Sequence, residues 1–429
     1  MFFATFFILF VSQIFVFYNP KKIQDNIKEI VIIAPKEYRD DYVAGIQMAI
    51  DEVNASGGVL GKSIRASYLD DKYSKEELQS DAILPEMLIE ANIIGQNDDI
   101  IGVVGQGRSY QLLPAAVVLN GYRKLMISTG STSTTLTSIG LNYLFSILPN
   151  DDDLSIVLAR YVHEKDLKKI IILSDGTRPS EDLVIRVRSE LMAYNIDVVF
   201  EIDSSVGGVD QLDRSLLFIM DNDIFKPTDV DGFFLISKWP LSYSVVIQHM
   251  RKFGLNQPIF GPPNLDSREL VNAVGKDLMK DVYTVTTVDQ QHFDRFNDLF
   301  AKEYYKKYGK LPFADSYRGY EAIKLLSEAI NDTNSFDPAG VANYLRGLRY
   351  KNKNKSSGDK IAFDNKGLIT DENINIIVHD GEGFKVAATY SKPFSWDNDE
   401  DINASSMIKS LIAGDLRNQR ARKRRIRGL

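Results

Sequence analysis

Short apolar runs alternate with amphipathic stretches along most of the chain, which is the pattern of βαβ units around parallel sheets. In a first series we expect strands at 30–34, 64–69, 100–104 and 125–127 and helices near 41–55, 75–94 and 110–121. In a second series, after Pro149, we expect strands at 170–173, 197–201, 232–236 and 258–260 and helices near 151–165, 180–194, 209–221, 241–253 and 266–274. Two such series predict an α/β fold of two doubly wound lobes, with ligands bound at the carboxyl ends of the strands.

The stretch 42–71 combines a helix, its stop signal and a strand in one unit. Apolar residues fall near helical spacing at Val43, Ile46, Ile50 and Val53. Asp40 or Asp41 stands where it can cap the first turn, and Gly57 and Gly58 can take the left-handed conformation that ends a helix. The strand 64–69 follows, and the acids Asp70 and Asp71 lie at its carboxyl end.

This unit resembles the opening of the type I periplasmic-binding-protein family, which includes the branched-chain amino-acid receptors of ABC importers. The helix with Tyr317, Glu321 and Ala322 looks like that family's "Y.A..ll..Ai" helix, and FDNKG at 363–367 matches its "FD..G" turn. The resemblance spans residues 29–390 and implies two Rossmann-like lobes joined by three crossovers, near 149, 286 and 355.

The resemblance gives a division of the chain. We expect residues 28–149 with 287–353 in the first lobe and residues 150–286 with 354–390 in the second. Residues 1–20 form an apolar segment, and residues 391–429 form an acidic connector and a basic tail.

The first candidate binding site is the run 101–110, which leaves a strand, turns through two glycines and enters a helix. Free backbone N–H groups at a helix start favour an anion, and the Ser109 hydroxyl can donate a further hydrogen bond, which makes a carboxylate site. Ser109 falls where the family's carboxylate-binding serine stands, and Tyr110 follows it. Arg108 replaces a small residue and adds either a contact to the ligand or a salt bridge to a neighbouring acid.

The second candidate is the loop after the strand 125–127, rich in hydroxyl groups. Gly130, Ser131 and Thr132 match the family loop whose carbonyl and threonine hydroxyl hold a bound amino acid. The alternative is a Ser/Thr-rich surface turn that caps the next helix.

The second lobe departs from the family pattern. Asp175 lies in a loop that lacks the receptors' tyrosine, and Trp239 takes over as an aromatic wall or is simply packed. After Gly261 and Pro262 the receptors carry an acid for the ligand ammonium, but Pro263 stands here, with Asn264 and Asp266 as nearby substitutes. We therefore expect a ligand other than a standard branched-chain amino acid.

Catalytic and metal chemistry finds little support in the sequence. The chain has no cysteine, no G-x-S-x-G elbow and only four scattered histidines. The acidic run 397–401 begins like a calcium loop, but Ile402 occupies the required glycine position. We expect neither an enzyme nor a cofactor.

Charge and hydropathy separate the two ends of the chain from its body. The net charge is −7, but residues 402–429 carry +7 and leave −14 for the rest, which argues against nucleic acid as a partner. The tail forms either a disordered basic segment or an amphipathic helix that docks on anionic lipid or an acidic partner. Residues 1–18 are almost wholly apolar and form either an export signal or an uncleaved membrane anchor.

Our main hypothesis is an extracytoplasmic solute-binding protein that captures a small polar ligand, such as an amino acid, a carboxylate or an amide, for the permease of an ABC importer. The alternative is a ligand-sensing or partner-binding regulatory protein of the cell envelope with the same fold.

Overall fold

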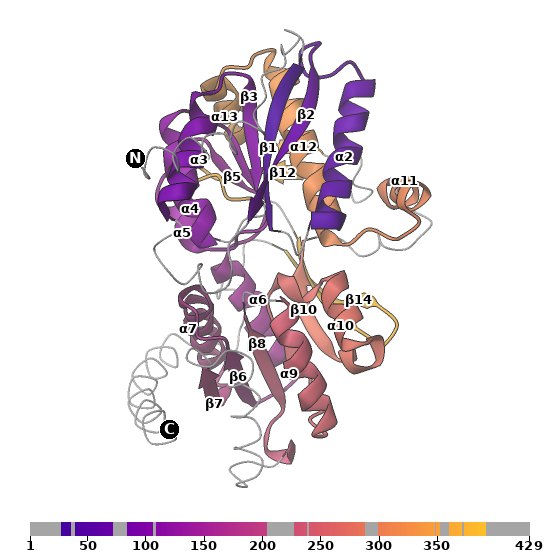
Figure 1. The fold of residues 1–429 in the computed structure, drawn as a ribbon. Coiled ribbons are helices and arrows are strands. Elements are labelled where there is room, and N and C mark those ends of the chain that lie inside the picture. The colour runs from indigo at the N-terminus through magenta and orange to yellow at the C-terminus, as the bar shows by residue number, and fades with distance from the viewer. Residues whose placement is uncertain are drawn as a thin grey trace, which may run out of the picture.

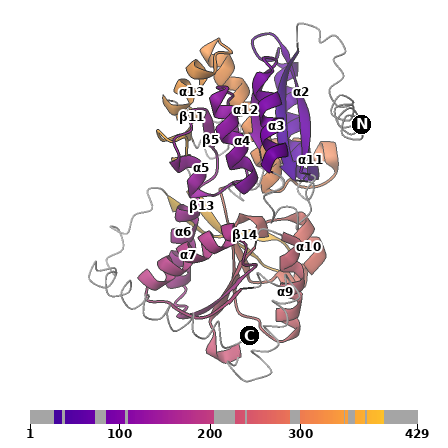
Figure 2. The same cartoon turned by 60° about the vertical axis from the view of Figure 1, so that its left-hand side comes forward.

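The structure is a computed structural model that describes residues 27–35, 39–71, 84–105, 109–203, 227–237, 240–287, 299–347, 349–351, 360–370 and 373–391. Figure 1 shows two lobes, one above the other, each built around a sheet. In Figure 2 the same two sheets are seen with helices packed beside them.

The first lobe has a five-stranded sheet with the order β2-β1-β3-β4-β5, in which every neighbouring pair is parallel. Its strands are β1 (Ile27–Pro35), β2 (Ser63–Asp71), β3 (Ile100–Gly105), β4 (Met126–Ser128) and β5 (Leu144–Ser146). Each residue of β3 is buried, as expected for a central parallel strand that is covered on both faces.

The helices of the first lobe come from both halves of the chain. They are α2 (Arg39–Ala55), α3 (Leu84–Gln96), α4 (Ser109–Gly121), α5 (Thr134–Ser138), α11 (Leu299–Tyr308), α12 (Ala314–Thr333) and α13 (Pro338–Gly347). In Figure 1 the late helix α12, in orange, lies beside the indigo α2. Ile46 of α2, Leu326 of α12 and Ile30 of β1 belong to one core cluster, so this face of the sheet forms only when distant segments meet. A short antiparallel pair, β11 (Arg349–Lys351) with β12 (Lys360–Ala362), follows α13.

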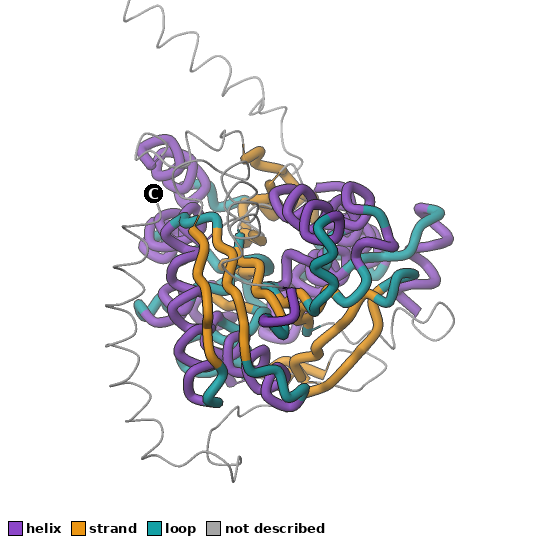
Figure 3. The backbone as a smooth tube through the Cα atoms, turned by 90° about the horizontal axis from the view of Figure 1, so that it is seen from below, coloured by secondary structure: helices purple, strands orange, loops and turns teal. Residues whose placement is uncertain are grey.

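The second lobe has a seven-stranded sheet with the order β14-β13-β10-β9-β8-β6-β7, antiparallel only at β10/β13 and β13/β14. Its strands are β6 (Lys169–Ser174), β7 (Asp197–Asp203), β8 (Gly232–Ile236), β9 (Ile259–Phe260), β10 (Val282–Thr286), β13 (Asn373–His379) and β14 (Phe384–Ser391). Its helices are α6 (Asp151–Glu164), α7 (Arg178–Ala193), α9 (Pro240–Lys252) and α10 (Arg268–Val274), with 3₁₀ turns η4 (Pro227–Asp229), η5 (Pro263–Leu265) and η6 (Lys276–Met279). Viewed from below in Figure 3, strands of the molecule run between helices. Separate core clusters lie on the α6/α7 face and on the α9/α10 face.

The expected α/β fold with parallel sheets is confirmed. The predicted helix 41–55 ends as expected, because Gly57 and Gly58 take φ values of 102° and 77°. The helix expected at 75–94 is described from Leu84 on, and the helix expected near 209–221 lies outside the described residues. The strands β5 and β10 and the helix α13 were not predicted.

The chain segment 361–369 packs against the first lobe. Ile361, Phe363 and Ile369 belong to the core cluster of that lobe. The backbone N–H of Ser146 in β5 donates to the carbonyl of Gly367 at 2.7 Å. A Cβ at Gly367 would overlap the carbonyl of Leu144, so this close approach needs a glycine. These contacts join residues 361–369 to the core of the first lobe, and the position of the third crossover stays a prediction.

Candidate functional site

The carboxyl ends of the parallel strands in the two lobes face each other. Asp41, in the first turn of α2 after β1, pairs with Arg268, the first residue of α10 after β9: Arg268 Nε lies 2.9 Å from Asp41 Oδ2. Arg268 also donates to the carbonyl of Leu311 at 2.5 Å and lies 4.3 Å from the centre of the Phe313 ring. One side chain of the second lobe therefore contacts two segments of the first, the start of α2 and the stretch that leads into α12.

Asp41 is the centre of this interlobe cluster. The side chain is 7% exposed, and its Oδ1 accepts from Lys310 at 2.8 Å and from the Tyr304 hydroxyl at 2.7 Å. Burial alone would raise the pKa of Asp41, but the hydrogen bonds from Arg268, Lys310 and Tyr304 outweigh it and hold the pKa below its ordinary value. Asp41 is therefore an ionised anchor. The sequence indicated only a helix cap at this position.

The loop after β4 is held rigidly at the carboxyl end of the first sheet. Thr129 is fully buried, and its hydroxyl donates to the Gly105 carbonyl at 3.0 Å and meets the Tyr42 hydroxyl at 2.7 Å. Gly130 follows, partly exposed, and Ser131 is 2% exposed. The predicted loop is thus anchored at its start by Thr129, which helps to position a binding loop.

Thr132 connects this loop to the start of the second lobe. Its carbonyl accepts from the Asp151 N–H at 2.7 Å, and its hydroxyl forms a hydrogen bond with the Asp151 carboxyl group. A threonine hydroxyl keeps further hydrogen-bonding capacity. Ligand binding by Thr132 therefore stays a prediction, and a ligand would share this hydroxyl with Asp151.

The other predicted residues of the first lobe lie at the start of α4. Ser109 and Tyr110 form its first turn, directly after β3 on the chain. Arg108 lies outside the described residues. The expected helix start at the carboxyl end of β3 is confirmed, while the binding role of its side chains stays a prediction.

In the second lobe, Asp175 and Asn264 stabilise the loops of their own lobe. Asp175 accepts from the Thr177 N–H at 3.0 Å and from the Ser237 hydroxyl at 2.8 Å, which links the ends of β6 and β8. Asn264 donates to the Ser237 carbonyl at 2.9 Å and meets the Tyr243 hydroxyl at 3.2 Å. Trp239 lies outside the described residues. Direct ligand contacts by these residues stay predictions.

A buried acid and a buried base approach each other across the lobes. Asp266, after η5 in the second lobe, is 6% exposed, and Arg318 of α12 is 7% exposed. Arg318 Nη1 donates to Asp315 Oδ1 at 3.1 Å, but its Nε and Asp266 Oδ2 have no hydrogen-bond partner within the described part of the chain. Burial raises the pKa of Asp266 to about 7, while the charge of Arg318 opposes that rise. The sequence singled out Asp266 only as a substitute for a missing acid.

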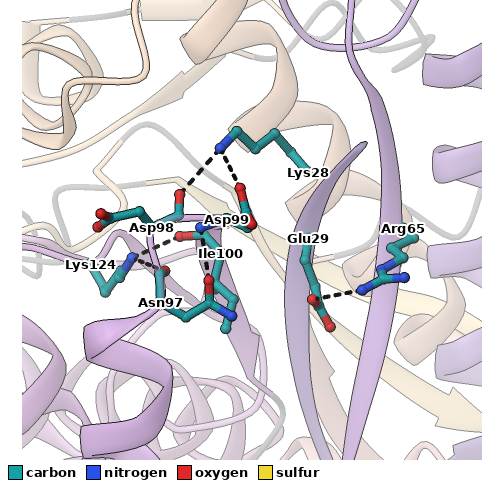
Figure 4. A network of polar contacts seen from close by, with 8 residues as sticks. All are labelled: Lys28, Glu29, Arg65, Asn97, Asp98, Asp99, Ile100 and Lys124. Atoms are coloured by element: carbon teal, nitrogen blue, oxygen red, sulfur yellow. Dashed lines mark hydrogen bonds and ion pairs between the residues drawn. The ribbon is translucent and has the colours of Figure 1, made fainter. Parts of the chain in front are cut away.

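A different polar network lies at the amino-terminal ends of β1 and β3 (Figure 4). Lys124 donates to the carbonyls of Asn97 and Ile100 at 2.6 and 2.9 Å, and Lys28 pairs with Asp99 at 3.0 Å. The network thereby ties the start of β3 to its two neighbours in the sheet, β1 through Lys28 and β4 through Lys124. Because this network lies at the end of the sheet opposite to the interlobe contacts, we assign it a structural role.

The described ranges contain no candidate metal centre and no candidate membrane span. They hold no group of three or more His, Asp or Glu side chains that could bind a metal ion. No helix among them has the length and apolar character needed to cross a membrane, and residues 1–18 and the basic tail lie outside them.

Comparison with known proteins gives consistent similarities. A family model described as periplasmic binding protein matches residues 35–372. The chain is 26% identical over 313 residues to a Leu/Ile/Val-binding protein of Citrobacter freundii. The matched region makes up 72% of this chain and 79% of that protein. It is 26% identical over 330 residues to a Leu/Ile/Val/Thr-binding protein of Salmonella typhimurium, and the match spans 75% of this chain and 84% of that protein.

Solved structures share the fold. An ABC transporter substrate-binding protein from Desulfitobacterium hafniense in complex with Leu superposes with a TM-score of 0.69 at 21% identity, covering 84% of this chain and 99% of that chain. A solute-binding protein from Rhodopseudomonas palustris in complex with 3,4-dihydroxy benzoic acid gives 0.69 at 21% identity, with 86% and 98% covered.

Proposed function

Because the chain belongs to the periplasmic binding protein family, we propose that it captures a small polar ligand between its two lobes and delivers it to the permease of an ABC importer. Family membership implies an extracytoplasmic location. The observation that carries the proposal is the contact of Arg268 with Asp41, because it brings the carboxyl ends of β1 and β9 together from opposite lobes. Ligands of parallel sheets bind at such ends.

For the first lobe, we propose that Ser109, Tyr110 and the loop Gly130, Ser131 and Thr132 bind one polar end of the ligand. The anchoring of that loop at Thr129 supports this assignment, since the Thr129 hydroxyl is bonded to both β3 and α2. Arg108 adds a charge-assisted contact in this proposal. Trp239, together with the loop of Asp175 after β6 and the turn of Asn264 after β9, encloses the ligand from the second lobe.

The lobe boundaries are likewise a proposal. We propose that the first lobe comprises residues 28–149 and 287–370 and the second residues 150–286 and 371–390. The pairing of Ser146 with Leu368, and the place of Ile369 in the first-lobe core, support the extension of the first lobe to 370.

The test is a thermal-shift screen of amino acids, small carboxylates and amides, followed by small-angle scattering with and without any stabilising compound. A ligand that binds both lobes prefers the closed arrangement, so the bound particle should be more compact. A complete screen without a stabilising compound would contradict ligand capture and favour the alternative of a partner-binding regulatory protein.

A further inference from the structure

Asp266 and Arg318 form a polar pair that the expected site does not contain, since the sequence pointed only to Asp266, as a substitute for a missing acid. Asp266 follows the turn η5 at the carboxyl end of β9, and Arg318 lies in the first turns of α12. Each is more than nine-tenths buried, and their charges interact. The pair therefore spans the two lobes near the place where Arg268 contacts Asp41.

Both members of the pair have unused hydrogen-bonding capacity. Asp266 Oδ2 and Arg318 Nε are buried and find no partner within the ranges that the structure describes. A buried polar atom left without a partner destabilises the protein. A group placed between these atoms would satisfy both if it accepted a hydrogen bond from Arg318 and donated one to Asp266.

The charges around the pair limit that group. Asp315 already neutralises Arg318 through a contact of 3.1 Å. The positive charge of Arg318 would repel an ammonium group. The acids Asp266 and Asp315 would repel a carboxylate. Burial further favours the uncharged form of Asp266, since it raises the pKa to about 7. A neutral group with a donor and an acceptor side by side avoids these repulsions.

We propose that Asp266 and Arg318 bind a primary carboxamide group of the ligand, whose carbonyl accepts from Arg318 and whose amino group donates to Asp266. This inference rests on the proposed function, and it gives that function a substrate class. With Pro263 in place of the receptors' acid, Asp266 would then supply the polar contact from the second lobe to the ligand.

The test uses two matched series of probes: isobutyramide, isobutyrate and isobutylamine, and benzamide, benzoate and benzylamine. Calorimetry on the full chain should show binding of at least one amide, about tenfold or more tighter than its matched acid and amine. Tighter binding of the acid or the amine in both series would overturn the inference. If other small molecules stabilise the protein while these amides do not bind, the inference fails and the proposed function stands.

Variants separate recognition from packing. Asp266→Leu should weaken amide binding by about tenfold or more, while Asp266→Asn, which keeps one donor and one acceptor, should retain it within about threefold. Arg318→Met should weaken it as well. Asp277→Leu, at an exposed position of η6, is the matched control and should bind like the wild type. Amide affinity unchanged in Asp266→Leu would overturn the inference, as would an Asp266→Asn variant that loses binding, because that result identifies a required negative charge.

Discussion

At the scale of single residues, Asp151 connects the binding loop to the second lobe. It is the first residue of α6 and 8% exposed, and both its N–H and its carboxyl group bond to Thr132. Burial raises its pKa from 3.8 to about 7, although the Thr132 hydrogen bond and the charge of Arg186 oppose the rise. The protonation of one side chain at the first crossover is thus linked to the loop expected to bind the ligand.

This raised pKa predicts a pH dependence of stability. Because the unfolded chain releases the Asp151 proton at a lower pH than the folded protein, the free energy of unfolding falls as the pH rises from about 4 to about 7. Asp151→Asn removes this loss and should stabilise the protein at pH 8 by up to about 4 kcal/mol, from 1.36 kcal/mol per pKa unit, with little change at pH 4. Urea denaturation at pH 4 and pH 8 measures the free energy of unfolding of the variant and the wild type. An equal increase at both pH values would contradict the prediction.

Thr132 and Ser109 provide a second prediction. Thr132→Ala or Ser109→Ala should weaken ligand binding by roughly 1–3 kcal/mol, the range for a buried partner left unsatisfied. Calorimetry with a ligand found by screening measures the loss. Thr135→Ala, at an exposed position of α5, is the control. Affinities equal to that of the control would remove these residues from the site.

Pro263 supports a prediction about ligand choice. By its resemblance to the branched-chain receptors, the chain is expected to place Pro263 where they carry an acid for the ligand ammonium. A buried ammonium without such a partner is strongly destabilised. Leucine, isoleucine and valine should therefore bind weakly or not at all in calorimetry. Submillimolar affinity for any of the three would show the prediction to be wrong.

At the scale of elements, the packing of α2 on α12 depends on glycines. A Cβ at Gly45 would overlap the carbonyl oxygen of Ser316, and a Cβ at Gly319 would lie 2.8 Å from the carbonyl oxygen of Tyr42. The two helix backbones therefore approach closely at these positions. This contact closes the core of the first lobe.

Gly45→Ala should force the helices apart and lower the free energy of unfolding by about 1–3 kcal/mol, as overpacking does. Gly340→Ala in α13 is the matched control, because its Cβ would meet only Asp337 Oδ2 at 3.4 Å and alanine favours a helix. Denaturation midpoints of both variants test the contrast. A stable Gly45→Ala variant would mean that α2 and α12 can separate without loss.

The elements also show how far sequence reasoning reaches. The apolar run of β3 and the Gly57-Gly58 stop after α2 predicted those elements because their signals are local. β5 has only three residues and β10 carries a mixed pattern, so neither gave a clear period. The positions of Ser109 and the loop after β4 could be predicted from strand ends. The pairing of Arg268 with Asp41 could not, because it joins residues 227 positions apart.

At the scale of the whole molecule, Arg268 holds the lobes in contact. It binds Asp41, Leu311 and Phe313, while Asp41 keeps Lys310 and Tyr304 as partners of its own lobe. Removal of the Arg268 side chain therefore acts mainly on the contact between lobes. The interior of each lobe keeps its bonds.

Arg268→Met should increase the radius of gyration of the unliganded protein in small-angle scattering, because the lobes lose this contact. Ligand affinity should fall roughly severalfold, since the closed state becomes less populated. Lys280→Met, at an exposed position of the same lobe, is the control. An unchanged radius and affinity would mean that other contacts set the distance between the lobes.

The contribution of α11 and α12 to the first lobe has a consequence for the time at which the protein folds. Asn331, near the end of α12, accepts from the Leu60 N–H across 271 positions, and Lys307 pairs with Asp51 across 256. During synthesis the first lobe stays without these partners until most of the chain has been made. Contacts between residues this distant in sequence slow folding, so the emerging chain remains unfolded for longer. In that unfolded state, a protein destined for an extracytoplasmic location can still be threaded through a membrane channel.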